Sequence, residues 1–249
     1  RLGESEGGQL VWEAIEAHGG LTRWLAAGTI AFEFDYRPLG KPERRMHTDN
    51  RVDLWRSRAW QKELGEDADA TFGFDGDTAW IVPGPDAFPA PSRFWATTPY
   101  YFVGVPWVLA DPGTKFDRME DAELDGTSYR LVKVSYEQGT GDSPDDYYIA
   151  YIHPETKHVD AIRYVVSYPA LVREGEHTPE KLMLYLDQRQ VDGLRVAHRY
   201  EAYAYDVDAG ERGEKVTEVD VKDVRFAKHW PAELFAAPED AHIDESHRP

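Results

Sequence analysis

The sequence predicts a mainly β fold: one large curved antiparallel sheet with an N-terminal helix and a short helical lid on its concave side. Short segments of alternating apolar and polar residues follow one another along most of the chain, which is the pattern of strands buried on one face. Tight-turn residues separate them and no helices alternate with them, which favours an antiparallel meander. A Pro-rich aromatic segment interrupts the pattern midway.

The composition restricts the class of protein and its partners. The chain has 249 residues, 41% of them hydrophobic, and we expect a single domain over residues 1–249 with a core of 10–238 and a frayed C-terminal tail. The net charge of −18 argues against nucleic acid as a partner, since phosphate binding needs a basic face. The lack of cysteine excludes a disulfide framework, a thiolate metal site and a cysteine nucleophile.

The N-terminal part of the chain changes from a helical to a strand pattern. Residues 10–25 have apolar side chains at spacings of three and four, which predicts an amphipathic helix. Gly19-Gly20 lies inside this stretch and should kink or split it. From Thr29 the period is two, so residues 29–36 should form a half-buried strand. We expect its apolar side chains to face the concavity: Ile30, Phe32, Phe34 and Tyr36.

Later strands are marked by tight turns. Asp75-Gly76 and Asp192-Gly193 supply positive-φ turn positions, and His153–Thr156 reads as a third turn. Together with the first strand, these segments predict about ten strands that end near residue 227.

The segment FWATTPYYFVGVPWVLADPG, residues 94–113, has six aromatic residues, yet its prolines prevent a long regular element. A single sheet with one apolar face needs a cover, and the chain offers little besides the N-terminal helix and this segment. We interpret the segment as a lid across the mouth of a concave cavity. The alternative is a closed plug, in which the same side chains simply fill the core.

The candidate ligand-binding residues are large apolar or aromatic side chains expected on the concave face or the lid. Tyrosine suits the wall of an amphiphilic cavity, because its ring is apolar and its hydroxyl needs a partner when buried. The strands contribute Phe32, Phe34, Tyr36, Trp80, Tyr136, Tyr164 and Tyr168, and the lid contributes Phe94, Trp95, Tyr100, Tyr101, Phe102, Trp107 and Leu109.

The order of these segments resembles a known family. The helix end and first strand read AHGGLTRWLAAGTIAFEF, the Pro-rich insertion follows midway, and GTSYRLVKVSY and YYIAYIHPETKHVDAIRYVV come after it. Over residues 10–238 this is similar to the periplasmic lipoprotein-carrier (LolA/LolB-like) superfamily. The resemblance implies a half-open β-barrel closed by helices, acyl chains held in the concavity, and a periplasmic or otherwise extracytoplasmic location. Because the chain begins at Arg1 without Met, we expect an export signal to have been removed.

Motifs of catalysis and metal binding are absent from the sequence. The nine histidines form no HExxH pair, the serines lack a Gly-x-Ser-x-Gly context, and there is no phosphate-binding or dinucleotide-binding loop. Residues 206–210 resemble the start of a calcium loop, but the spacing to a bidentate acid is wrong, so a hairpin turn is the better interpretation. We expect no metal and no cofactor.

These observations favour a non-enzymatic protein that binds a lipid, a lipoprotein acyl chain or another hydrophobic ligand. Transport of that ligand is the further function that they suggest. The expected partners are that ligand and a lipoprotein or membrane-bound acceptor, with the protein itself a monomer. Two alternatives remain open. One is a hydrolase or isomerase with an acid/base group in a β-cavity, and the other is a scaffold module whose cavity is filled.

Overall fold

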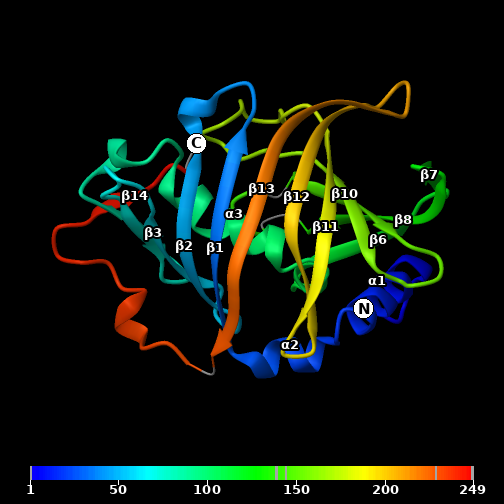
Figure 1. Cartoon of the computed structure of the whole chain (residues 1–249), viewed down its shortest axis with the longest axis horizontal. Helices are drawn as coiled ribbons and strands as arrows, with labels where there is room; N and C mark the ends of the chain where they lie inside the picture. The colour runs from blue at the N-terminus through cyan, green and yellow to red at the C-terminus, as the bar shows by residue number, and fades with distance from the viewer. Residues whose placement is uncertain (1, 138–139, 144, 228, 248–249) are drawn as a thin grey trace.

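The computed structural model describes residues 2–137, 140–143, 145–227 and 229–247. Within these ranges, one antiparallel sheet of 14 strands dominates the molecule, with β14 and β6 at its two edges. The sheet curves around the helices without closing, so the predicted half-open barrel is confirmed (Figure 1). The strand order is β14-β5-β4-β3-β2-β1-β13-β12-β11-β10-β9-β8-β6, with β7 paired to β8.

The regular elements follow the predicted order, and the described residues form more strands than the ten expected. The helices are α1 (Glu6–Ala17), α2 (Leu21–Ala27) and α3 (Ser92–Val103). The strands are β1 (Thr29–Pro38), β2 (Met46–Asp53), β3 (Arg58–Glu63), β4 (Thr71–Phe74), β5 (Ala79–Val82), β6 (Thr114–Arg118), β7 (Ala122–Leu124), β8 (Thr127–Tyr136), β9 (Tyr147–Ile152), β10 (Val159–Tyr164), β11 (Lys181–Val191), β12 (Leu194–Asp206), β13 (Glu211–Ala227) and β14 (His242–Asp244).

The predicted N-terminal helix is split at Gly19-Gly20, as the sequence indicates. Gly19 and Gly20 have φ values of +113° and +87°, which L side chains rarely adopt. A Cβ at Gly19 would lie 2.3 Å from the carbonyl oxygen of Gly193, in the turn between β11 and β12. The glycine therefore allows the α1–α2 corner to pack directly on that turn, where Arg23 also donates to the Gly193 carbonyl (2.9 Å).

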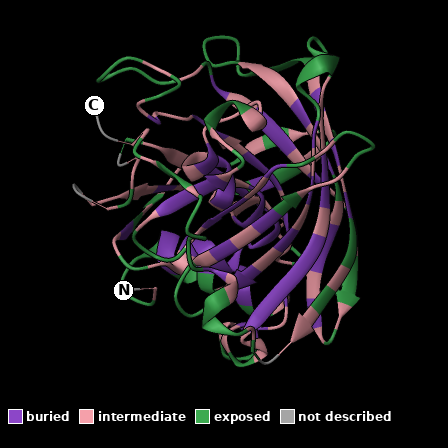
Figure 2. Ribbon diagram, turned by 90° about the vertical axis from the view of Figure 1, so that its left-hand side faces the viewer, coloured by how far each residue is buried: buried purple, intermediate pink, exposed green. Residues whose placement is uncertain are grey.

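Strand β1 confirms the predicted alternation. Ile30, Phe32 and Phe34 are fully buried in the main core on the concave side, and the ring of Tyr36 contacts Trp95 of α3 there. Figure 2 shows the same division over the whole molecule, with buried residues gathered inside the curve and exposed residues on the loops.

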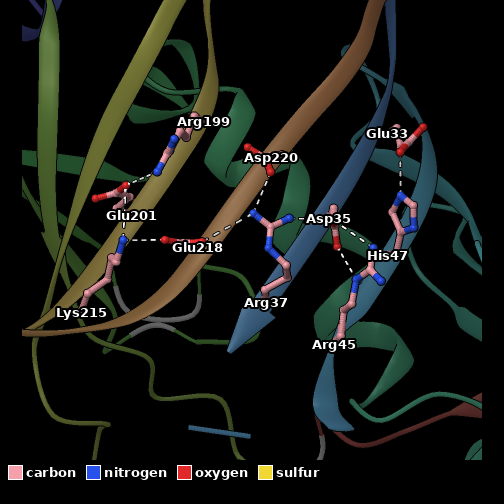
Figure 3. A network of polar contacts seen from close by, with 10 residues as sticks. All are labelled: Glu33, Asp35, Arg37, Arg45, His47, Arg199, Glu201, Lys215, Glu218 and Asp220. Carbon is pink, nitrogen blue, oxygen red and sulfur yellow. Dashed lines mark hydrogen bonds and ion pairs between the residues drawn. The ribbon is translucent and has the colours of Figure 1, made fainter. Parts of the chain in front are cut away.

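The convex face of the central strands carries a network of ion pairs (Figure 3). Asp35 accepts hydrogen bonds from Arg37 (2.6 Å) and Arg45 (2.7 Å), and Arg37 also bonds Asp220 on β13 (2.7 Å). Burial alone would raise the pKa of Asp35, but the hydrogen bonds from Arg45 and Arg37 outweigh it and lower that pKa. The convex face is thus covered by charges that neutralise one another, and the apolar face is left for the concavity.

The C-terminal tail differs from the frayed end that the sequence predicts. Strand β14 pairs with β5, and the Asp244 carboxylate accepts hydrogen bonds from the Ser92 hydroxyl (2.6 Å) and the Arg93 amide (2.9 Å). Asp244 thereby caps the first turn of α3, whose own N-cap residue, Pro91, offers no side-chain acceptor. A three-residue strand fixed by one carboxylate has no periodic signal, which is why the sequence does not reveal it.

We expect Asp244→Ala to lower the free energy of unfolding by about 1 kcal/mol, because two donors at the start of α3 lose their acceptor. Urea unfolding of the variant and of wild type measures the difference. Asp240→Ala, in the exposed turn just before β14, is the matched control and should leave stability unchanged. Equal stabilities for Asp244→Ala and wild type would contradict the capping role.

Candidate ligand-binding cavity

A cavity of about 700 Å³ lies between the concave face of the sheet and α3. Its volume is within the range of ligand pockets that enclose a drug-sized molecule. Eleven of the 32 residues described in its lining are aromatic, and most of the polar lining residues lie on the loops around it. The aromatic lining residues are Tyr36, Phe74, Phe94, Trp95, Tyr100, Tyr101, Phe102, Tyr136, Tyr148, Tyr164 and Tyr168.

Helix α3 forms one wall of the cavity although it contains a proline. Pro99 has no amide hydrogen, so the carbonyl of Trp95, four residues earlier, has no intrahelical donor. The buried side chain of Gln61 on β3 supplies the missing donor, with its Nε2 2.9 Å from the carbonyl oxygens of both Trp95 and Ala96. This bond ties the helix to the sheet at the point where the proline weakens it.

The side chains of α3 contact the sheet and the segment after β10 through aromatic ring pairs at the cavity edge. Phe94 lies 5.0 Å from Tyr168, and Phe102 lies 6.1 Å from Tyr164 and 6.0 Å from Phe34, measured between ring centroids. These separations are typical of favourable aromatic pairs. Helix α3 is therefore held over the sheet at both ends of the cavity, and the space between these contacts stays open.

The tyrosine hydroxyls of the inner wall are neutral and open to a ligand. Burial raises the pKa of Tyr101, Tyr136, Tyr148 and Tyr164 above the ordinary value. Among the described residues, no hydrogen-bond partner is found for these four hydroxyls. They can donate to or accept from a polar atom of a ligand, but they bring no charge into the cavity.

One lining carboxylate lies on the inner wall and is already bonded. Burial raises the pKa of Asp146 to about 6, and hydrogen bonds from Ser167 act in the opposite direction. Its Oδ1 accepts from both the amide (2.6 Å) and the hydroxyl (2.8 Å) of Ser167. Asp146 thus anchors the segment after β10.

Nine of the fourteen predicted residues line the cavity, and five are buried elsewhere. The nine are Tyr36, Phe94, Trp95, Tyr100, Tyr101, Phe102, Tyr136, Tyr164 and Tyr168. Phe32 and Phe34 are buried below the cavity floor. Trp80 faces away from the main core and donates its indole N–H to the Phe235 carbonyl (2.9 Å).

Trp107 and Leu109 belong to a closed part of the core. They lie in a short 3-10 turn (Trp107–Ala110) after α3 and are each 1% exposed. The Trp107 ring stacks on Trp24 of α2 at 4.3 Å with nearly parallel planes. Segment 94–113 therefore has two parts: α3 lines a cavity, as in the lid interpretation, and the turn after it is a plug.

The structure adds lining residues that the sequence analysis did not single out. Tyr148 on β9 faces the cavity, and its period-two spacing from the buried Ala150 and Ile152 would have placed it there. The basic residues Lys41, Arg44 and Lys181 also line the cavity. The first two lie in a loop, where no periodic pattern assigns a direction to a side chain.

The buried histidine, His18, has a structural role. His18 Nδ1 donates to the Ala14 carbonyl (2.8 Å), and burial lowers the pKa of His18 to about 4, so the ring is neutral near pH 7. Within the described part of the chain, no three His, Asp or Glu side chains lie close enough together to hold a metal ion.

Comparisons with known proteins agree on the fold. No protein-family model and no curated protein matches the sequence. Among solved structures, a LolA superfamily protein from Nitrosomonas europaea aligns with a TM-score of 0.58 and 8% identity, over 93% of this chain and 97% of that one. The chain has the LolA-type fold. A putative outer membrane lipoprotein-sorting protein domain from Vibrio parahaemolyticus aligns with a TM-score of 0.52 and 12% identity, over 91% and 94% of the two chains.

The similarity to LolA-type structures confirms the resemblance suggested by the sequence at the level of the fold. This chain has the N-terminal helix, the open sheet and the helical segment on the concave side that the resemblance implies. In the described ranges, the helices are too short or too polar to cross a bilayer.

Proposed function

We propose that this protein binds a hydrophobic ligand, such as a lipid or acyl chain, without covalent chemistry, and carries it outside the cytoplasm. The observation that carries the proposal is the open cavity of about 700 Å³ walled by aromatic rings. A void of this size in an ordinary core is costly, because its lining atoms lose packing partners. A ligand that fills the cavity supplies those contacts.

The fold supports a carrier function. One similar structure is described as an outer membrane lipoprotein-sorting protein domain and another as a LolA superfamily protein. In a half-open sheet the concavity can be reached without unfolding the core, which suits a ligand that has to enter and leave. We also propose that this protein works outside the cytoplasm and passes its ligand to a lipoprotein or a membrane-bound acceptor.

The two alternative functions have weaker support. An enzyme in this cavity would need an acid or base free to move a proton, whereas Asp146 is held by Ser167 and the tyrosines are neutral. A scaffold module would have a filled core, and the cavity argues against that.

We expect Val166→Trp to weaken binding of the uncharged probe N-phenyl-1-naphthylamine at least about tenfold, because the indole occupies space that the probe needs. Val166 lines the cavity. Probe fluorescence at increasing protein concentration gives the affinity. Val207→Trp is the matched control, since Val207 is 61% exposed in the turn between β12 and β13.

Two outcomes would count against the proposal. Wild type that does not bind the probe would remove its main support. Equal loss of binding in the Val166 and Val207 variants would show that the probe binds outside the cavity. Native mass spectrometry of the purified protein is an independent check, and we expect co-purified acyl-chain molecules.

A further inference from the structure

The charge of the cavity lining is opposite to that of the whole chain. The chain has a net charge of −18. Among the described residues that line the cavity, four are basic and two are acidic: Lys41, Arg44, Arg93 and Lys181 against Asp142 and Asp146. Because the chain as a whole is so acidic, the excess of basic residues in the cavity lining is a specific feature of this site.

Within the part of the chain that the structure describes, three of the four basic residues have no carboxylate partner. Arg93 is neutralised by Asp142, with its Nε 2.6 Å from an Oδ of that residue. Lys41, Arg44 and Lys181 form no ion pair within the described ranges; Arg44 donates only to the Pro89 carbonyl (3.1 Å). By contrast, the neighbouring Arg45 is paired with Asp35 on the convex face.

Lys181 points into the concavity. It is the first residue of β11, and the next two residues on its face, Met183 and Tyr185, belong to the main core. The preceding Glu180 is paired with Arg163 (2.8 Å), whose guanidinium lies over Tyr205 beside the second, smaller core cluster. Burial lowers the pKa of Lys181, as expected for an ammonium group that has lost water and gained no anion.

The strand register places Lys181 at the same end of the sheet as the loop that carries Lys41 and Arg44. Pro38 at the end of β1 pairs with Thr217, Thr217 with Ala202, and Ala202 with Met183. Lys181 lies two residues beyond this row, on the side where β1 runs into its loop (Figure 1). Pro38 and Met183 are separated by three strand spacings, or about 14 Å. The three cations therefore flank one mouth of the cavity.

We propose that the ligand is an amphiphile with an anionic head, a carboxylate or a phosphate, which sits among Lys41, Arg44 and Lys181 while its apolar chain enters the aromatic cavity. The inference rests on the proposed function and adds the class of ligand and its orientation. An anion at the mouth gains charge-assisted hydrogen bonds from donors that otherwise lack an anionic partner. The acidic groups elsewhere on the chain are screened beyond about 8 Å at physiological ionic strength.

The test compares cis-parinaric acid with its methyl ester, which share one chain and differ in head charge. We expect wild type to bind the acid about tenfold more tightly than the ester, measured by probe fluorescence at physiological ionic strength, where the distant acidic groups are screened. Lys181→Met should weaken binding of the acid more than binding of the ester and so reduce this preference severalfold, and Lys181→Arg should retain it. Lys115→Met, at an exposed lysine on β6 outside the cavity, is the matched control and should behave as wild type.

The outcomes separate this inference from the proposed function. Equal binding of acid and ester by wild type would overturn the anionic-head site and leave the carrier proposal intact. Failure of both probes to bind would overturn both. Arg44→Gln, at an exposed position, gives a second reading if Lys181→Met does not fold, and it should also reduce the preference. Competition by palmitate, by lysophosphatidate and by inorganic phosphate identifies the head that is preferred; displacement by inorganic phosphate alone as strongly as by lysophosphatidate would contradict a site for an amphiphile.

Discussion

Trp107→Ala is expected to lower the free energy of unfolding by about 3–5 kcal/mol, the range for loss of a large side chain from a packed core. Trp107 is 1% exposed, stacks on Trp24 of α2, and has an edge contact with His18 at the end of α1. It therefore joins the 3-10 turn after α3 to both N-terminal helices. Truncation would open a void among elements that cannot collapse independently. Urea unfolding followed by far-UV circular dichroism measures the loss.

Tyr101→Ala is the variant with which the stability loss of Trp107→Ala should be compared. Tyr101 belongs to the same aromatic segment but lines the cavity, so one side of its ring has few packing partners. We expect a smaller loss of stability, about 1–2 kcal/mol, together with weaker binding of N-phenyl-1-naphthylamine. Similar stability losses in both variants, with probe binding unchanged, would show that all of segment 94–113 is a plug.

The parts of the fold that the sequence predicts are those with a regular period. In β1 the period-two spacing of the large apolar residues Ile30, Phe32 and Phe34 decides which face joins the main core, and the structure agrees. The Gly19-Gly20 pair is equally readable, because two positive-φ residues in a helical stretch must break it. At these positions the residue types of the local sequence are enough to determine the backbone structure.

The division of the candidate site between cavity and core could not be predicted, since it depends on contacts distant in sequence. Trp107 and Tyr101 are both aromatic residues of one Pro-rich segment, but Trp107 stacks on the distant Trp24, whereas Tyr101 lines the cavity. Trp80 is turned away from the concavity by the Phe235 carbonyl, which lies far along the chain. Lys181 has a period-two position, but its importance appears only when the lining charges are seen together.

Asp111 gives the protein a pH dependence that a single substitution isolates. Its carboxyl group follows the 3-10 turn and lies near Tyr100 and Tyr101, and burial raises the pKa of Asp111 to about 7. A carboxyl group whose folded-state pKa lies above its unfolded value stabilises the fold below the unfolded pKa. That contribution is lost as pH rises from about 4 through 7, because the folded protein must then hold a poorly solvated charge.

Asp111→Asn keeps the shape of the side chain and removes the titration. We therefore expect the variant to gain stability relative to wild type as pH rises, with a difference at pH 8 that exceeds the one at pH 4.5 by about 2 kcal/mol once partial exposure is discounted. Urea unfolding of both proteins at the two pH values measures it. A difference that stays constant with pH would mean that the Asp111 carboxylate is well solvated in the folded protein. A difference that grows toward acid pH would reverse the sign and rule out burial as the dominant effect on this group.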